Sequence, residues 1–305
     1  MSTRPSVLPR FGLLALPPAT LASAHDGTTL FAESDWLHWT GDLWVAGAIA
    51  FAAILYARGC RRHARSAPRS KNSWSQWSWW AGWSALALAL LSPLDTLGAE
   101  LFSAHMIQHE LLMLVAAPLL VLGRPLAMFA WALPASWATR VGRIFRVKWW
   151  RQFWRWLTLP VIAWLLHAVA LWAWHIPSFF EAGLRSAAVH DVQHASFFGT
   201  ALLFWWALVR RRRRAETTIH VFTTLMHTGM LGMLLTFATT PWYAFYAHTA
   251  PIRGLSPLED QQLGGLIMWV PSGALLVIAG LLLAHAWLRH LGRVPSRPVE
   301  FVNEP

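Results

Sequence analysis

The chain has little charge and almost no cysteine. Of its 305 residues, 13% are charged, about half the share that is usual for a soluble domain of this size. Cys60 is the only cysteine, so an internal disulfide and any CxxC or CxxxC thiolate metal site are excluded. A metal ion would have to be held by His, Met and carboxylate side chains. Acidic residues are also few, with 14 Asp and Glu against 25 Lys and Arg.

Apolar residues, by contrast, make up 56% of the chain, and 22 residues are Trp. Apolar runs of about twenty residues recur, the length that a helix needs to cross a hydrocarbon layer of about 30 Å. Trp side chains are typical of the two membrane–water interfaces. We therefore predict an all-α fold, a polytopic membrane bundle of seven transmembrane helices. The expected spans are about Trp36–Ala57, Trp79–Leu97, Phe102–Leu122, Leu157–Trp174, Val189–Val209, Ile219–Thr240 and Leu263–Leu288.

Two segments outside these spans have their own expected roles. Residues 1–24 resemble a secretory signal, with early Arg residues, the apolar stretch FGLLAL and an A-x-A cleavage site at Ala22–Ala24. Cleavage there would expose His25 as a terminal residue able to chelate copper; the alternative is a solvated tail. Residues 25–290 would then form the seven-span domain and 291–305 a cytoplasmic tail. The segment Pro125–Trp137 is too short to cross and is expected to be interfacial or re-entrant.

The basic residues fix an expected orientation. Of the 25 Lys and Arg residues, 21 fall on alternate loops and on the C-terminal tail. Only Arg185 and Arg253 lie on the opposite loops, and Arg4 and Arg10 lie in the signal region. Because cytoplasmic loops carry the excess of basic residues, the N-terminus is predicted outside and the C-terminus in the cytoplasm. Topology explains the basic clusters without a nucleic-acid partner.

Two HxxxH pairs stand at the heads of apolar runs. His105 and His109 open the run that ends at Pro125, and His190 and His194 open the run VHDVQHASFFGTALLFWWALV. A spacing of four residues places both rings of a pair on one helical face, about 6 Å apart along the axis. With the predicted orientation, both pairs lie within two turns of the outer surface.

Other polar side chains are expected at the same depth. His175 ends the fourth predicted span, and His38 with Asp42 lies near the start of the first. The remaining outer polar residues are Asp95, Glu259 and Asp260. Buried polar groups in a membrane are costly unless they are paired, and they usually mark function. This convergence favours a metal or haem site near the outer surface.

Each of these residues also has a structural explanation. A single HxxxH pair can simply hydrogen-bond a neighbouring helix or a lipid headgroup, and His38 with Asp42 can be a structural pair. His167 and His227, deep in their spans, are expected to be packing residues. Met226, Met230 and Met233 share a helical face, as soft ligands for Cu(I) or as adaptable packing; Met106 and Met268 are comparable.

Four blocks of the sequence resemble a known family. HMIQHELLMLVAAPLLVLGRP, WHIPSFFEAGL, VHDVQHASFFGTALLFWW and DQQLGGLIMWVPSG are similar, in this order, to the CtaG family of cytochrome c oxidase assembly factors. The resemblance implies a bacterial inner-membrane protein that helps a haem–copper oxidase to mature, with oxidase subunits as partners. The positions that match the family's motif residues are His105, His109, His175, His190, His194, Asp260 and Met268.

The sequence therefore favours a non-enzymatic assembly factor that binds copper at the outer side and presents it to an oxidase subunit. A periplasmic copper donor is a further possible partner. The alternatives are a bis-histidine haem protein, whose axial ligands would come from facing helices, and a copper permease with a polar path across the bilayer. No nucleophile–base pair indicates a hydrolase. Because imidazole ligands must be neutral, copper affinity is expected to fall below about pH 6.5.

Overall fold

The computed structural model describes residues 42–66, 73–210 and 214–291, which form helices and no strand. The signal region, His25, His38 and the tail beyond residue 291 lie outside these residues. The first helices along the chain are α1 (Leu43–Ser66), α2 (Ser73–Leu91), α3 (Pro93–Glu100), α4 (Phe102–Glu110), the π-helix η2 (Leu111–Ala116), α5 (Ala117–Leu122) and α6 (Pro125–Ala132). They are followed by α7 (Ala135–Arg146), α8 (Lys148–Leu157), α9 (Pro160–Trp174), α10 (Pro177–Arg185), α11 (Ala187–Arg210), α12 (Arg214–Thr236), the 3₁₀ turns η3 (Ala244–Ala247) and η4 (Ala250–Arg253), and α13 (Pro257–Leu291).

The prediction of an all-α membrane bundle is confirmed, but the count of seven spans is not. Five segments of the described chain are long and apolar enough to cross a membrane: Leu43–Ser66, Phe102–Leu122, Ala187–Val209, Thr218–Thr236 and Pro257–His285. A sixth is obtained only if α8 and α9, which meet at a bend of 62°, are taken as one broken span. The orientation of the termini stays a prediction.

Local chemistry explains why the second and fourth predicted spans are shorter than expected. The second predicted span ends early because Ser92 and Pro93 start a new helix, α3, with the Ser92 hydroxyl accepting a hydrogen bond from the Leu94 amide. The amino-terminal half of α2 is rich in Ser and Trp, which lowers its hydropathy. The fourth predicted span is reduced to the 15 residues of α9 because Pro160 begins that helix. Fifteen helical residues span only about 22 Å.

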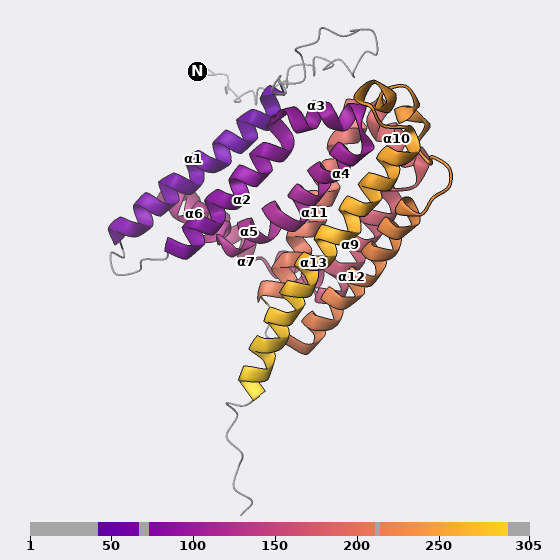
Figure 1. Ribbon diagram of the computed structural model, residues 1–305. Coiled ribbons are helices and arrows are strands. Elements are labelled where there is room, and N and C mark those ends of the chain that lie inside the picture. Colours follow the sequence, from indigo (N-terminus) through magenta and orange to yellow (C-terminus); the bar gives the residue numbers. More distant parts are fainter. Residues whose placement is uncertain (1–41, 67–72, 211–213, 292–305) are drawn as a thin grey trace, which may run out of the picture.

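The helices form a main bundle with a smaller group beside it (Figure 1). The bundle contains α4, α9, α11, α12 and α13, whereas α1, α2 and α6 lie together on one side. Helices α3 and α10 lie at one end of the molecule, and α6, α7 and the last turns of α13 lie toward the other. The short segment after Pro125, expected to be interfacial or re-entrant, is the eight-residue helix α6, which packs on α1.

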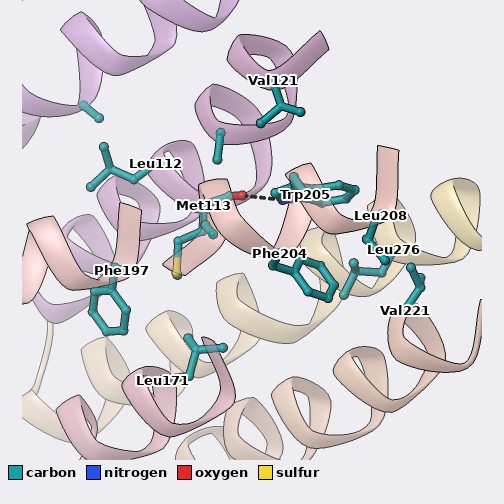
Figure 2. Packing of buried hydrophobic residues seen from close by; sticks show 13 residues of the cluster. Leu112, Met113, Val121, Leu171, Phe197, Phe204, Trp205, Leu208, Val221 and Leu276 are labelled. Atoms are coloured by element: carbon teal, nitrogen blue, oxygen red, sulfur yellow. Dashed lines mark hydrogen bonds between the residues drawn. The ribbon is translucent and has the colours of Figure 1, made fainter. Parts of the chain in front are cut away.

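The core of the bundle surrounds the π-helix of the third predicted span (Figure 2). Leu112, Met113, Phe197 and Phe204 are buried there. A π-turn disturbs the regular ladder of backbone hydrogen bonds. The indole Nε1 of Trp205 donates to the carbonyl oxygen of Met113 at 2.9 Å, which satisfies one acceptor inside this turn. Aromatic and aliphatic side chains of α11 thereby hold an irregular segment in place.

Glycines allow α12 and α13 to approach closely. A Cβ atom at Gly265 would lie 2.7 Å from the carbonyl oxygen of Gly232, and one at Gly264 would lie 2.3 Å from the ring of Phe102. Small residues at such contacts are typical of helix packing in membranes. The Gly264 contact sets the first turn of α4 directly against α13, which fixes the position of the α4 histidines.

Candidate metal centre

Imidazole rings from α4 and α11 meet inside the bundle, near the end of the molecule at which α3 and α10 lie. The ring centroids of His105 and His109 are 4.3 Å apart, as expected for neighbours on one helical face. Across the two helices, the His194 ring lies 5.2 Å from that of His109 and 5.9 Å from that of His105. The sequence prediction that the two HxxxH pairs converge is therefore confirmed as geometry.

Three of these histidines could bind a single ion. One ring nitrogen each of His105, His109 and His194 lies within 4.8 Å of the others. Two nitrogens bound to one ion at about 2 Å are at most about 4 Å apart, so closure requires only small rotations of the rings. All three rings are buried, with exposed fractions of 1%, 1% and 8%.

Four of the six ring nitrogens of this trio lack the partners that buried polar atoms normally have. Nε2 of His105, both nitrogens of His109 and Nε2 of His194 are buried without a hydrogen bond. An unpaired polar group in a low-dielectric interior costs on the order of 1–3 kcal/mol. Several such atoms on three neighbouring rings are therefore costly, unless a ligand compensates them.

His190 and His175 lie next to the trio. The half-buried ring of His190 is 4.0 Å from that of His194 and 5.4 Å from that of His105. His175, at the end of α9, contacts Phe180 and Phe197, and these two rings in turn contact the α4 histidines. The structure thus brings four histidine rings together, and the fifth, His175, contacts two phenyl rings that also contact the α4 histidines.

One ring nitrogen of His175 is hydrogen-bonded and the other has no partner. Its Nδ1 lies 2.7 Å from the carbonyl oxygen of Leu171, to which it donates as Nδ1–H, and its Nε2 is buried without a partner. The neutral ring with its lone pair on Nε2 is the tautomer that a metal ligand requires.

Asp260, the carboxylate in the last motif block, anchors the start of α4. Its two oxygens accept hydrogen bonds from the backbone N–H of Phe102 at 2.6 Å and of Ser103 at 3.0 Å, and from the Ser103 hydroxyl at 2.6 Å. The first N–H groups of a helix have no partner within it, and a carboxylate there also complements the helix dipole. Asp260 thereby fixes the position of α4, one turn before His105.

Polar residues that the sequence analysis did not single out surround the histidines. Gln108, fully buried, donates from Nε2 to Oδ1 of Asp95 at 2.7 Å and to the Ala89 carbonyl at 2.8 Å. Gln193 is also fully buried, and neither of its amide atoms has a partner. The position of these two glutamines in the sequence is what could have identified them, because each directly precedes a motif histidine inside an apolar run.

The segment between α12 and α13 closes the end of the site. The hydroxyl of Tyr243 donates to the His175 carbonyl at 3.0 Å, and that of Tyr246 donates to the Gly98 carbonyl at 2.9 Å. Both rings are buried against Phe102 and Phe180. Burial raises the pKa of both tyrosines, so their hydroxyls remain protonated donors. This cover separates the histidines from solvent at that end.

Other candidates lie apart from the cluster. Asp42 caps its own helix, with Oδ1 accepting from the amides of Trp44 and Val45. Met268 is buried in the packing cluster around Phe102. The stripe of Met226, Met230 and Met233 is exposed on the outer face of α12, with exposed fractions of 50%, 49% and 41%. This stripe therefore does not form a buried ladder.

The comparison with known families is now decisive. The profile described as cytochrome c oxidase caa3 assembly factor (Caa3_CtaG) matches residues 54–290, most of the chain. The chain belongs to this family. The match contains all five histidines, Asp260 and Met268.

Several curated relatives are longer than this chain. An uncharacterized protein of Mycobacterium bovis and one of Mycobacterium tuberculosis are each 26% identical to it over 284 residues, covering 85% of this chain and 40% of theirs. One of Mycobacterium leprae is 24% identical over 239 residues, covering 70% of this chain and 34% of its own. This chain thus spans less than half the length of these relatives. No solved structure matches it.

Proposed function

We propose that this membrane protein of the cytochrome c oxidase assembly factor family binds copper in its α4–α11 histidine cluster and passes it to an oxidase subunit. Copper is the cargo in this proposal and the chain is not an enzyme. The cluster would face the outer side of a bacterial inner membrane, where a periplasmic donor can supply the metal. The family membership supports the assembly role, and the cluster supports the choice of cargo.

The observation that carries the proposal is the set of unpartnered nitrogens. His105, His109 and His194 offer ligand atoms within 4.8 Å of one another. Nε2 of His105, both ring nitrogens of His109 and Nε2 of His194 have no hydrogen bond to the described residues. Imidazole binds copper in both of its common oxidation states. Three neutral nitrogens without a carboxylate or thiolate partner hold the ion less firmly than a closed structural site does, which suits handover.

His190 is suited to a role in entry and release. Its ring is half-buried and lies 5.4 Å from that of His105, whereas the trio is buried. An ion exchanging one imidazole for another could pass from His190 to His194, whose ring centroids are 4.0 Å apart. His175 and Asp260 would support the site from behind and from the start of α4.

The ring packing favours a single ion over haem. In a bis-histidine haem protein the porphyrin plane separates the two axial rings. Here the rings of His109 and His194 lie edge to face, with centroids 5.2 Å apart and planes at 87°. A porphyrin would have to push the two helices apart, whereas an ion fits with small rotations. A visible spectrum with a Soret band would favour haem instead.

The proposal is tested in cells that carry single alanine variants of His105, His109 and His194. The matched control is His248→Ala, an exposed histidine in the α12–α13 segment. We expect the oxidase of the three cluster variants to lose copper while keeping its haem, and the control to have normal copper. Normal oxidase copper in all three variants would contradict copper delivery by this cluster.

A further inference from the structure

A second polar pocket lies deeper in the bundle than the histidine cluster. It is a cavity of about 20 Å³ between α9, α11, α12, α13 and the α4–η2 junction, enough for one water molecule or one ion. Its lining includes the polar or sulfur-bearing residues Glu110, Met113, His167, Thr224, Met268 and Ser272. Met113 lies four residues beyond His109, so the pocket is about one helical turn further into the span.

Polar atoms at this pocket are left without partners. Oε2 of Glu110 and Oγ of Ser272 are buried and have no hydrogen bond, and Ser272 is only 4% exposed. Nδ1 of His167 lies 3.1 Å from the hydroxyl of Thr200, which holds that ring in place. No Lys or Arg is among the residues that line the pocket. The carboxyl group at this depth has no side-chain cation in the lining, so it carries a proton unless a bound cation of single positive charge replaces that proton.

The residues that line the pocket combine soft and harder donors. Met113 and Met268 carry thioethers, His167 an imidazole and Glu110 a carboxyl group. Thioether sulfur selects Cu(I), whereas Ca²⁺ and Mg²⁺ take oxygen ligands in larger numbers. In Figure 2 the side chain of Met113 extends toward the side of the core on which Leu171 lies, and Leu171 also lines the pocket.

We propose that this pocket is a second copper site, which takes Cu(I) between the thioethers of Met113 and Met268 with His167 and Glu110 as the other ligands. The site does not depend on the proposed role of the α4–α11 histidines. It differs in ligand type, because the cluster offers imidazole nitrogens alone. Met113 belongs to the π-helix that directly follows Glu110, and such π-turns are frequent at functional sites.

The test is an anaerobic titration of the purified full chain with Cu(I), in competition with a chromogenic Cu(I) chelator. The key variant is Met113→Leu/Met268→Leu, a substitution that conserves volume. The matched control is Met226→Leu/Met230→Leu, which changes two exposed thioethers on α12. We expect two Cu(I) per wild-type chain and per control chain, and one for the key variant.

X-ray absorption spectroscopy at the copper edge, which detects sulfur atoms bound to the metal, distinguishes the two sites. His105→Ala/His194→Ala is expected to keep one Cu(I) with sulfur neighbours, and Met113→Leu/Met268→Leu to keep one without them. If the histidine variant loses nothing, the proposed function fails while the second site stands. A wild-type chain with one Cu(I) and no sulfur neighbour would overturn the second site, leaving the pocket to a water molecule.

A second variant guards against misfolding of the methionine double variant. Glu110→Gln keeps the shape of the side chain and removes the negative charge that would balance Cu(I). We expect it to bind the second Cu(I) at least about tenfold more weakly, with a melting temperature unchanged from wild type. Unchanged affinity for both ions in Glu110→Gln and in the methionine variant would reject the site.

Discussion

The α4 histidines and His167 of α9 are almost equally buried, but their hydrogen bonding differs. His105 and His109 are each 1% exposed and His167 is 4% exposed. His167 bonds to Thr200 and stacks on Phe204. Both ring nitrogens of His109, in contrast, have no partner. Burial of a histidine thus does not by itself indicate a ligand. The two unpartnered nitrogens of His109 are the stronger sign, whereas the bond to Thr200 occupies Nδ1 of His167 and leaves only its Nε2 for a metal.

The hydrogen bonding of His167 also explains why this residue alone does not reveal the deep pocket. That ring has a protein partner, and the unpartnered atoms of the pocket belong to Glu110 and Ser272. In a membrane interior no bulk water is available to satisfy such atoms. Because the two regions differ in this way, we expect some substitutions to change metal binding and others to change stability.

The largest expected effect is on copper binding by His105→Ala/His194→Ala. Removing two of the three clustered ligands should weaken Cu(II) binding by more than about 100-fold, since even a residue that only supports a metal ligand contributes 10- to 100-fold. Equilibrium titration of the purified chain measures the change, with His248→Ala as the exposed control. Wild-type affinity in the double variant would place the ligands elsewhere.

Asp260→Ala should act on stability more than on copper binding. The substitution removes three hydrogen bonds to a carboxylate at the start of α4, and we expect a loss of about 2–4 kcal/mol in the free energy of unfolding. Denaturation of the purified chain with and without copper measures both properties. The control Glu259→Ala, an exposed residue beside it, should cost less. Weaker copper binding by Asp260→Ala at unchanged stability would identify Asp260 as a ligand.

Acidification should release copper from the histidine cluster. Protons compete with the metal for neutral imidazole nitrogens, so affinity should fall at acidic pH. Because the three rings are buried, which disfavours the protonated form, the fall should begin below the unperturbed value of about 6.5 rather than at it. Titrations from about pH 7 to about pH 4, with ionic strength held constant, measure the effect. Constant affinity over this whole range would count against imidazole ligands.

His175→Ala should have a smaller effect than the loss of a clustered histidine. Its ring contacts Phe180 and Phe197 and does not belong to the three-histidine group, so we expect about a tenfold weaker affinity through loss of support. The same copper titration measures it. A loss as large as that of His105→Ala would make His175 a direct ligand.

Thr200→Val should have the smallest effect. Valine has the shape of threonine but cannot hydrogen-bond Nδ1 of His167, so the unfolding free energy should fall by about 1 kcal/mol. Copper binding by the α4–α11 cluster should be unchanged, because Thr200 bonds to the deep histidine. Thermal unfolding and a Cu(II) titration of the same sample check both expectations. Loss of Cu(II) binding would show that the two regions are coupled.

Sequence patterns predicted much of the fold and part of the site. The HxxxH spacing placed His105 with His109 and His190 with His194, because one helical turn fixes which residues share a face. The apolar runs located most of the long helices, but not the break at Ser92–Pro93 or the short α9. The boundaries of these helices depend on caps and prolines, and an average of hydropathy along the chain detects neither.

Tertiary contacts explain what the sequence could not predict. Asp260 caps a helix that lies 158 residues away in the chain, and no local pattern records such a pair. The exposure of the Met226 stripe likewise depends on which face of α12 packs on α13. Gln193 and Glu110 could have been noted as polar residues in apolar runs, but their unpartnered atoms are visible only in the folded chain.

Electron paramagnetic resonance of the purified chain with one equivalent of Cu(II) tests the central claim most directly. The account predicts nitrogen hyperfine splitting from two or more imidazoles, lost in His105→Ala/His194→Ala and kept in His248→Ala. A Cu(II) signal without nitrogen splitting, or the same splitting in the double variant, would contradict copper binding by the α4–α11 cluster.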